Sequence, residues 1–275
     1  MEEIKAIASS SSSSASSAAF QQTISTGGLN TLLTTHFPTI QPLTPIRNNI
    51  YAAICTIIYV KIVMEVGSLI RVKFGLPELS RKFLHLCACS SLVFWPLFDS
   101  EHWGWRLNVT VPVVMSLRLL YKGAILKDPE DEDVRRMSRT SSPSELLYGP
   151  LQMTLVMCYV GLTKFYTNIG VIIMASFVGD WMAAMIGLNY GRHKFKVPLG
   201  GEKSIEGTIG CVLGTVLGIM FYSYMLDMEL VRWQLLLTYG CISALAEATA
   251  LHNWDNAILA VAMEASATQL PLRMG

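Results

Sequence analysis

The chain alternates long apolar runs with a basic break in residues 168–226, NIGVIIMASFVGDWMAAMIGLNYGRHKFKVPLGGEKSIEGTIGCVLGTVLGIMFYSYML. A helix needs about 17–25 residues to cross a bilayer, and residues 168–189 and 207–226 both have that length. The same alternation continues on either side. We predict spans at residues 50–70, 83–98, 105–121, 148–164, 168–189, 207–226 and 233–251. The predicted fold class is therefore all-α, a polytopic transmembrane helical bundle with about seven spans.

Composition also favours a membrane protein. Apolar residues make up 52% of the 275 residues and charged residues only 15%, whereas soluble domains carry about 25% charged residues. A charge at the bilayer centre costs roughly 2.5–3.5 kcal/mol on insertion scales, which keeps charged residues out of spans. The six cysteines lie in or beside apolar runs. We interpret them as small buried apolar residues, because Cys87 and Cys89 lack the spacing of a zinc pair.

Lysine and arginine alternate in number from one polar break to the next. The counts along the chain are 4, 1, 5, 1, 4 and 1, which is the pattern that the positive-inside rule predicts for a polytopic protein. The breaks at residues 71–82, 122–147 and 190–206 are therefore predicted to share one side of the bilayer, which we call the basic face. Residues 252–256 return to it.

The two ends of the chain differ from the middle. Residues 1–45 are rich in serine and have no acidic residue after Glu3, which predicts a disordered leader. The same composition is typical of an organelle transit peptide, and we expect a chloroplast one, with plain disorder as the alternative. Residues 46–256 are predicted to form the membrane domain. Residues 257–275 look like an atypical, truncated tail.

The break between the two quoted runs carries candidate chemistry. Asp180 lies inside an apolar run, where an ionisable residue indicates function, and a carboxylate there can hold Mg²⁺. A lysine, glycines and a helix N-terminus that follow the break are the parts of a phosphate site. The residues concerned are Lys203, Ser204, Glu206, Gly207 and Thr208. A capped loop whose lysines face lipid headgroups explains the same residues equally well.

Other ionisable residues lie at or inside predicted spans. Arg81 and His85 are four residues apart, with Lys82 beside them, so they can hold a phosphate on one helix face, or His85 can act as a base. A positive flank to the span is the alternative. Arg118 and Glu247 are candidates for buried charged support, paired with each other or serving the site separately. A further prediction is close helix packing along the stripe of Gly210, Gly214 and Gly218.

Five motifs occur in an order that resembles a known family. They are Arg81-Lys82-x-x-His85, Met137-Ser138-Arg139, Glu145-Leu146-Leu147-x-Gly149-Pro150-Leu151, Gly179-Asp180 and Lys203-Ser204-Ile205-Glu206-Gly207-Thr208. Over about residues 50–256 the chain resembles plant phytol kinases and farnesol kinases, which belong with dolichol kinase to the polyprenol kinases.

The resemblance implies transfer of a phosphoryl group from CTP to an isoprenoid alcohol in a chloroplast membrane. Phytol is the first candidate, before farnesol or geranylgeraniol, and the product would feed tocopherol synthesis. The implied partners are the bilayer, the alcohol and CTP, with Mg²⁺ as cofactor and no nucleic acid. Asp180, His85 and Lys203 are the expected catalytic residues. The expected phosphate-binding residues are Arg81, Lys82, Arg139, Lys203, Ser204, Glu206, Gly207 and Thr208, and the expected metal ligands are Asp180 and Asp255.

The chain departs from the family pattern beside Asp180. Trp181 stands where the family has glycine, and Ala184 stands where it has a second aspartate. These departures keep other functions open: a related CTP-using cytidylyltransferase, a catalytically impaired relative, or a membrane transporter. The chain shows no convincing internal repeat of the kind that transporters carry.

Overall fold

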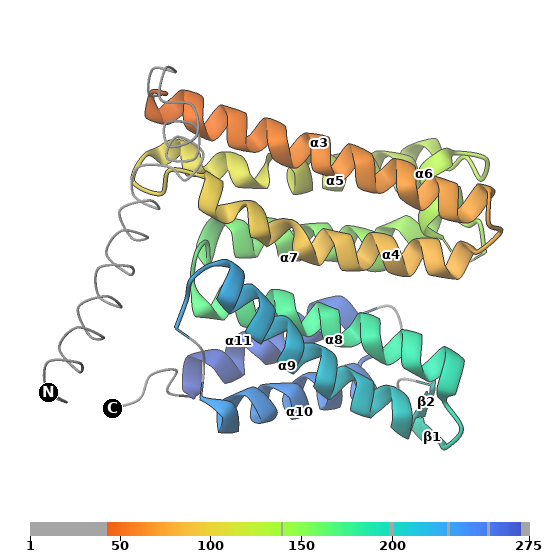
Figure 1. Ribbon diagram of the computed structural model, residues 1–275. Coiled ribbons are helices and arrows are strands. Elements are labelled where there is room, and N and C mark those ends of the chain that lie inside the picture. Colours follow the sequence, from red (N-terminus) through yellow and green to blue (C-terminus); the bar gives the residue numbers. More distant parts are fainter. Residues whose placement is uncertain (1–42, 139, 198–200, 230–231, 252–253, 271–275) are drawn as a thin grey trace, which may run out of the picture.

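The computed structural model describes residues 43–138, 140–197, 201–229, 232–251 and 254–270 (Figure 1). Its α-helices are α3 (Pro45–Val72), α4 (Pro77–Cys89), α5 (Thr110–Leu120), α6 (Glu132–Met137), α7 (Gly149–Thr163), α8 (Asn168–Tyr190), α9 (Ile205–Met225), α10 (Trp233–Thr249) and α11 (Asp255–Gln269). Short helical segments extend α4, α5 and α7. Those of the 3₁₀ type are η1 (Ser90–Leu97), η2 (Trp103–Val109) and η4 (Pro143–Leu147), and η3 (Tyr121–Leu126) is a π-helix. The leader predicted for residues 1–45 lies almost entirely outside these residues.

Five helical stretches are long and apolar enough to cross a membrane, which confirms the polytopic helical fold. They cover Pro45–Val72, Trp103–Leu126, Pro143–Thr163, Asn168–Tyr190 and Ile205–Met225. The other two predicted spans are helical but less regular or shorter. Residues 83–98 fall in α4 and η1, where Pro96 lies inside the 3₁₀ turns, and α10 has 17 residues. The total of seven spans therefore stays a prediction.

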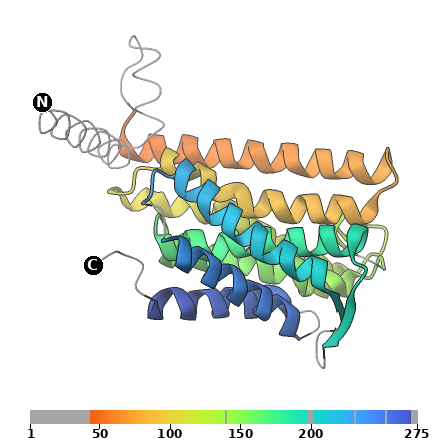
Figure 2. The same ribbon diagram turned by 60° about the horizontal axis from the view of Figure 1, so that its bottom comes forward.

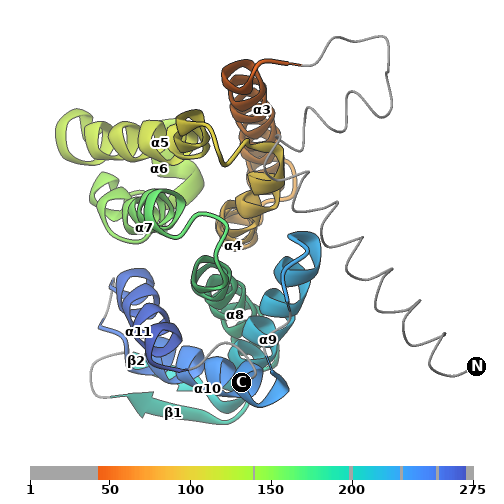
Figure 3. The same cartoon turned by 90° about the vertical axis from the view of Figure 1, so that its left-hand side faces the viewer.

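The helices form two neighbouring groups that run along a common direction. Helices α3 to α7 make one group and α8 to α11 the other, and Figure 3 shows both nearly end-on. Three connections that carry the basic breaks lie at the same end in Figures 1 and 2: the α3–α4 turn, the segment around α6, and the β hairpin before α9. This arrangement agrees with the predicted basic face.

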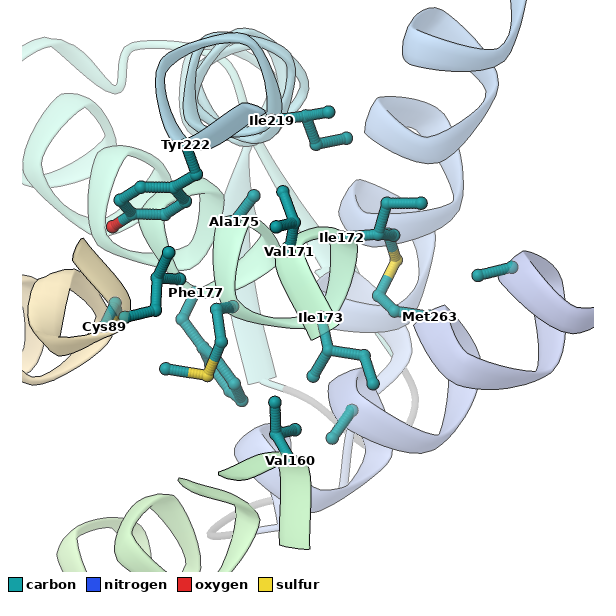
Figure 4. Close-up of a cluster of buried hydrophobic side chains, with 14 of the residues drawn as sticks. Cys89, Val160, Val171, Ile172, Ile173, Ala175, Phe177, Ile219, Tyr222 and Met263 are labelled. Atoms are coloured by element: carbon teal, nitrogen blue, oxygen red, sulfur yellow. The ribbon is translucent and has the colours of Figure 1, made fainter. Parts of the chain in front are cut away.

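Helix α8 is enclosed by the other helices. In its most apolar stretch 61% of the residues are buried, against 22% for α3. Figure 4 shows its side chains pointing in several directions, toward Cys89 of α4, Val160 of α7, Tyr222 of α9 and Met263 of α11. A helix that is apolar all round is typically buried inside a protein or a bilayer, and here α4, α7, α9, α10 and α11 pack around α8.

Glycines allow α8 and α9 to pack closely, as the glycine stripe predicted. A Cβ on Gly218 would lie 3.1 Å from the Ala175 Cβ, and one on Gly214 would lie 2.9 Å from the Gly179 Cα. A Cβ on Gly179 would lie 2.7 Å from the Cys211 carbonyl oxygen and would also overlap the Thr215 hydroxyl. Gly179 therefore lets the residue after it, Asp180, sit where α9 approaches most closely.

Helix α11 places residues 257–269, part of the expected atypical tail, within the packed bundle. Met263 and Ala267 are buried among side chains of the main core. Glu264 accepts a hydrogen bond of 2.6 Å from Tyr159 and forms an ion pair of 2.8 Å with Lys164. The hydrogen bond to Glu264 raises the pKa of Lys164. These partners explain how a segment with an acidic residue packs against α7.

Two short strands, β1 (Lys194–Val197) and β2 (Gly201–Ser204), form an antiparallel hairpin in which Lys194 pairs with Ser204. The sequence predicted a loop here, and strands of four residues are too short to be recognised from alternation. Since β2 leads directly into α9, the hairpin fixes Lys203 and Ser204 at the helix start.

The alternative in which Arg118 pairs with Glu247 is wrong, and so is the prediction that Arg118 is buried. The Arg118 side chain is 44% exposed, and it donates two hydrogen bonds to Asp133, from Nε to Oδ2 at 2.5 Å and from Nη2 to Oδ1 at 3.0 Å. Lys122 lies 2.7 Å from the same carboxylate, which is fully buried. Arg118 therefore fastens α6 onto the end of α5, and Glu247 has a different partner, described below.

We expect Asp133→Asn to lower the free energy of unfolding by on the order of 2 kcal/mol. Breaking a fully buried pair costs about 3–5 kcal/mol, and the partial exposure of Arg118 reduces that figure. Thermal unfolding in detergent would measure the change. The control is Glu130→Gln, whose pair with Arg135 is exposed on both sides. Equal effects of the two substitutions would contradict a structural role for Asp133.

We expect Gly179→Ala to destabilise the bundle by about 1–3 kcal/mol, the usual cost of overpacking, because the new methyl group meets the α9 backbone. Gly149→Ala is the control, since its Cβ would come no closer than 3.9 Å to the nearest atom considered. The thermal midpoints of both variants in detergent would be compared. An unchanged midpoint for Gly179→Ala would mean that α8 and α9 are not packed this closely.

Candidate functional site

A cavity of about 1300 Å³ lies between the two groups of helices. Ligand pockets commonly measure about 300–1,000 Å³, so this one has room for more than one small molecule. Its wall is polar near the basic face and apolar farther along the bundle. The ionisable residues that line it include Arg81, Lys82, His85, Asp180, Lys203, Glu247 and Asp255. Residues from three of the sequence motifs therefore meet at one place, together with Glu247 and Asp255.

Asp180 and His85 face each other across the boundary between α8 and α4. The His85 Nε2 atom lies 3.5 Å from the Asp180 Oδ2 atom, and both side chains are mostly buried. The imidazole packs edge-on against Phe177, with ring centroids 5.9 Å apart. Among the residues that the structure describes, no group makes a hydrogen bond to the buried His85 Nε2. Within the described residues this nitrogen therefore lacks a hydrogen-bond partner, and its side chain lines the cavity.

Basic side chains surround the Asp180 carboxylate. Lys82, His85, Lys203 and Arg81 all interact with it electrostatically, and Lys82 is itself buried. Because a desolvated carboxylate is costly unless positive charge is near, this arrangement holds Asp180 in the interior. It also concentrates positive charge where a phosphate could bind.

Lys203 bridges the hairpin and α10. Its ammonium group donates a hydrogen bond to Glu247, whose side chain is only 10% exposed. Glu247 thus supports the site by holding Lys203, and not by pairing with Arg118. The sequence placed both residues at the site without indicating which cation Glu247 would meet.

The start of α9 is a capped helix N-terminus. The Ser204 hydroxyl accepts a hydrogen bond of 3.1 Å from the Gly207 N–H, and the Thr208 hydroxyl donates to the Ser204 carbonyl at 3.0 Å. Ser204, Gly207 and Thr208 line the cavity. Glu206 is directed elsewhere and pairs with His193 at 2.7 Å, so it braces the hairpin. The helix is therefore capped and its start lines the cavity, while phosphate binding at this place stays a prediction.

Helix α11 contributes a carboxylate and an amide at its first turn. Asp255 lines the cavity and interacts electrostatically with His85. The next residue, Asn256, is buried and donates a hydrogen bond of 3.0 Å to the Gly149 carbonyl. Sequence reasoning did not assign Asn256 a role, although it directly follows the predicted metal ligand Asp255. It joins the Gly149-Pro150 motif to Asp255.

A short segment before α7 adds polar groups that sequence reasoning did not assign to the site. Thr140 donates a side-chain hydrogen bond of 2.5 Å to Glu145, and both residues line the cavity. Glu145 opens the motif that contains Gly149-Pro150, and that motif was the available signal. The predicted phosphate ligand Arg139 lies outside the described residues.

The two departures from the family pattern lie in different surroundings. Ala184, four residues after Asp180, lines the cavity, whereas Trp181 does not. Trp181 is therefore not placed to crowd a molecule in the cavity. The absent second carboxylate at Ala184 does lie in the cavity wall.

The carboxylates fit Mg²⁺ only together with a phosphate ligand. Nowhere in the described part of the chain do three or more His, Cys, Asp or Glu side chains gather as a metal site. Asp180 and Asp255 both line the cavity, however. Mg²⁺ commonly binds through one or two carboxylates while water and substrate phosphates supply its other ligands. The residues present suit that mode of binding.

Comparisons with known proteins agree with the resemblance. A probable chloroplastic phytol kinase 1 of Glycine max is 36% identical over 151 residues, 53% of this chain and 49% of that protein. A probable chloroplastic phytol kinase of Zea mays is 33% identical over 153 residues, 54% of this chain and 49% of that protein. The phytol kinase of Synechocystis is 42% identical over 60 residues, 22% of this chain and 24% of that protein.

The chain spans about half the length of the plant relatives that it matches. No solved structure matches it. A family model described as the cytidylyltransferase family matches residues 32–250, which include the hairpin, α8 and α9 and most of the cavity wall. By this match the chain, a multi-pass helical membrane protein, belongs to the cytidylyltransferase family.

Proposed function

We propose that this protein transfers the γ-phosphoryl group of CTP to the hydroxyl of an isoprenoid alcohol, phytol being the first candidate. The observation that carries the proposal is the single cavity in which His85, Asp180 and Lys203 line a polar end that continues into an apolar one. A nucleotide is soluble in water and an isoprenoid alcohol in lipid, so their reaction needs a site open to both. Similarity to phytol kinases supports the choice of substrate.

In the proposed reaction the alcohol oxygen forms a bond to the γ-phosphorus and the bond from that phosphorus to the bridging oxygen breaks. The products are the alkyl monophosphate and CDP. The hydroxyl proton passes to His85 Nε2, and Asp180, 3.5 Å away, stabilises the resulting imidazolium. The unsatisfied Nε2 atom supports this role for His85.

Positive charge near Asp180 would stabilise the transferring phosphoryl group. Phosphoryl transfer depends mainly on positioning and on neutralising the charge of the phosphates. Arg81, Lys82 and Lys203 line the same part of the cavity. A Mg²⁺ ion held by Asp180 and Asp255 would add charge there when the nucleotide is bound.

A cytidylyltransferase activity is the second candidate, because the matching family model carries that description. In that reaction a lipid phosphate would attack the α-phosphorus of CTP and release pyrophosphate. CTP labelled at the γ-phosphate distinguishes the two, since the label reaches the lipid only in the kinase reaction. CTP labelled at the α-phosphate marks the lipid only in the other.

We further propose a chloroplast membrane as the location and a role in tocopherol synthesis. The names of the plant relatives and the serine-rich composition of residues 1–45 support this proposal. A fluorescent protein fused after residue 50 tests the location. Chloroplast fluorescence is the expected result, and a diffuse cytosolic signal would reject the leader.

The first activity test uses membranes that contain the full-length protein, labelled CTP or ATP, and phytol, farnesol or geranylgeraniol. We expect CTP to support formation of a prenyl monophosphate. Asp180→Asn should lower kcat about 10²–10⁴-fold, because it removes the carboxylate that supports the proton-transfer group His85. Asp128→Asn, at an exposed aspartate, is the matched control. The kinase proposal fails if no nucleotide and alcohol pair gives a product.

The second test restores the missing carboxylate. Ala184→Asp places an acidic group in the cavity wall one helical turn from Asp180, so we expect half-maximal activity at a lower Mg²⁺ concentration. Trp181→Phe should leave the KM for CTP unchanged, because Trp181 does not line the cavity. An unaltered Mg²⁺ dependence in Ala184→Asp would contradict a metal role for this part of α8.

A further inference from the structure

We infer that the apolar part of the cavity binds the hydrocarbon chain of the alcohol, and that Met157 helps to set the chain length that the protein prefers. This inference rests on the proposed function. We call this part the apolar arm and define it by Val63, Ala88, Leu92, Met115, Met153 and Met157, all of which line the cavity. They come from α3, α4, η1, α5 and α7, and Figure 3 shows α3, α4, α5 and α7 as neighbouring helices.

The apolar arm begins beside the proposed base. Ala88 follows His85 by three residues on α4, so the two side chains lie on one helix face. Leu92 continues in the same direction along η1. An alcohol with its hydroxyl at His85 Nε2 would therefore meet apolar side chains from its first carbons onward. The polar and apolar parts of one cavity match the two parts of such a molecule.

The arm runs along α7 away from the basic face. Gly149, held by Asn256, lies near the polar end, and Gly161 lies at the far end, where its carbonyl accepts a hydrogen bond of 3.0 Å from Asn108. Twelve residues of α-helix rise about 18 Å. Phe98 and Val160, each 1% exposed, form the far wall together with Asn108. The arm thus has the length for an extended chain and a packed end.

The protein must distinguish alcohols of different chain length by how well the chain packs in the apolar arm. The alcohol leaves the hydrocarbon of the bilayer for an equally apolar arm, so hydrophobic transfer provides little net driving force. What remains is the fit of the chain against the side chains around it. Met115 of α5, Met153 and Met157 are unbranched and adaptable, and such side chains fill irregular spaces. Changing the volume of one of them should change which chain fits.

Met157 is the best position for the test because it lies two turns along α7 from Gly149, beyond the part of the arm that a short chain needs. Met157→Trp fills the arm and Met157→Ala widens it. The matched control is Met220→Trp, at a methionine of α9 that is exposed and does not line the cavity. Met115→Phe, on the opposite wall, gives a second filling variant should Met157→Trp fail to fold.

The experiment compares geraniol, farnesol and geranylgeraniol, which grow by one isoprene unit at each step, with the purified full-length protein. One readout is kcat/KM with CTP. The other is the thermal stabilisation that each alcohol produces without nucleotide, which requires binding alone. We expect the filling variants to lower the preference for geranylgeraniol over farnesol about 10-fold or more. Met157→Ala should raise that preference, and Met220→Trp should leave it unchanged.

The two readouts separate failure of this inference from failure of the proposed function. If no alcohol is phosphorylated but the stabilisation still depends on chain length and follows residue 157, the apolar arm stands and the kinase proposal falls. If alcohols are phosphorylated and every variant keeps the original preference, the chain lies elsewhere and the inference is overturned. Absence of both phosphorylation and stabilisation would overturn both.

Discussion

The enclosure of α8 is the constraint on which the rest of the structure depends. This helix has protein on all sides, and its close approach to α9 requires glycine at Gly179. Asp180 follows at once, so a carboxylate is forced into the interior of the bundle. A buried carboxylate is stable only with compensating charge, and α4 and β2 supply Lys82 and Lys203. The site is thus a consequence of how the core must accommodate one buried carboxyl group.

Helices α3, α5 and α7 differ from α8 because only one face of each packs inside the protein. Helices α3, α5 and α7 keep large apolar side chains on their outer faces, as helices in lipid do, and leave space between their inner faces. That space joins the charged region near the basic face. A protein built this way can bring a lipid-soluble molecule to charged groups without exposing those groups to lipid. This physical arrangement underlies the kinase proposal more directly than any single motif.

Much of the helical framework could be predicted from hydropathy and charge. Five of the predicted spans correspond to long apolar helices, and the alternation of basic residues matched the observed end of the bundle. The hairpin was missed because its strands are four residues long, and α11 because its charged residue hid the apolar face. The pairing of Glu264 with Lys164 and Tyr159 shows how that charge is accommodated.

The candidate site likewise contains residues that the sequence indicated and pairings that it did not. Sequence motifs indicated His85, Asp180, Lys203 and Asp255, and all four line one cavity. Sequence could not indicate that Arg118 would bind Asp133, that Glu247 would bind Lys203, or that Trp181 would lie outside the cavity while Ala184 lines it.

The sequence by itself determined that the chain is a helical membrane protein, which of its faces is basic, and which motifs carry ionisable groups. Those properties follow from local composition and from spacing along the chain. Only the tertiary structure decided the partner of each charge and the existence of an amphipathic cavity. Both depend on distances between residues far apart in sequence, and those distances are set by how closely α8 packs against its neighbours.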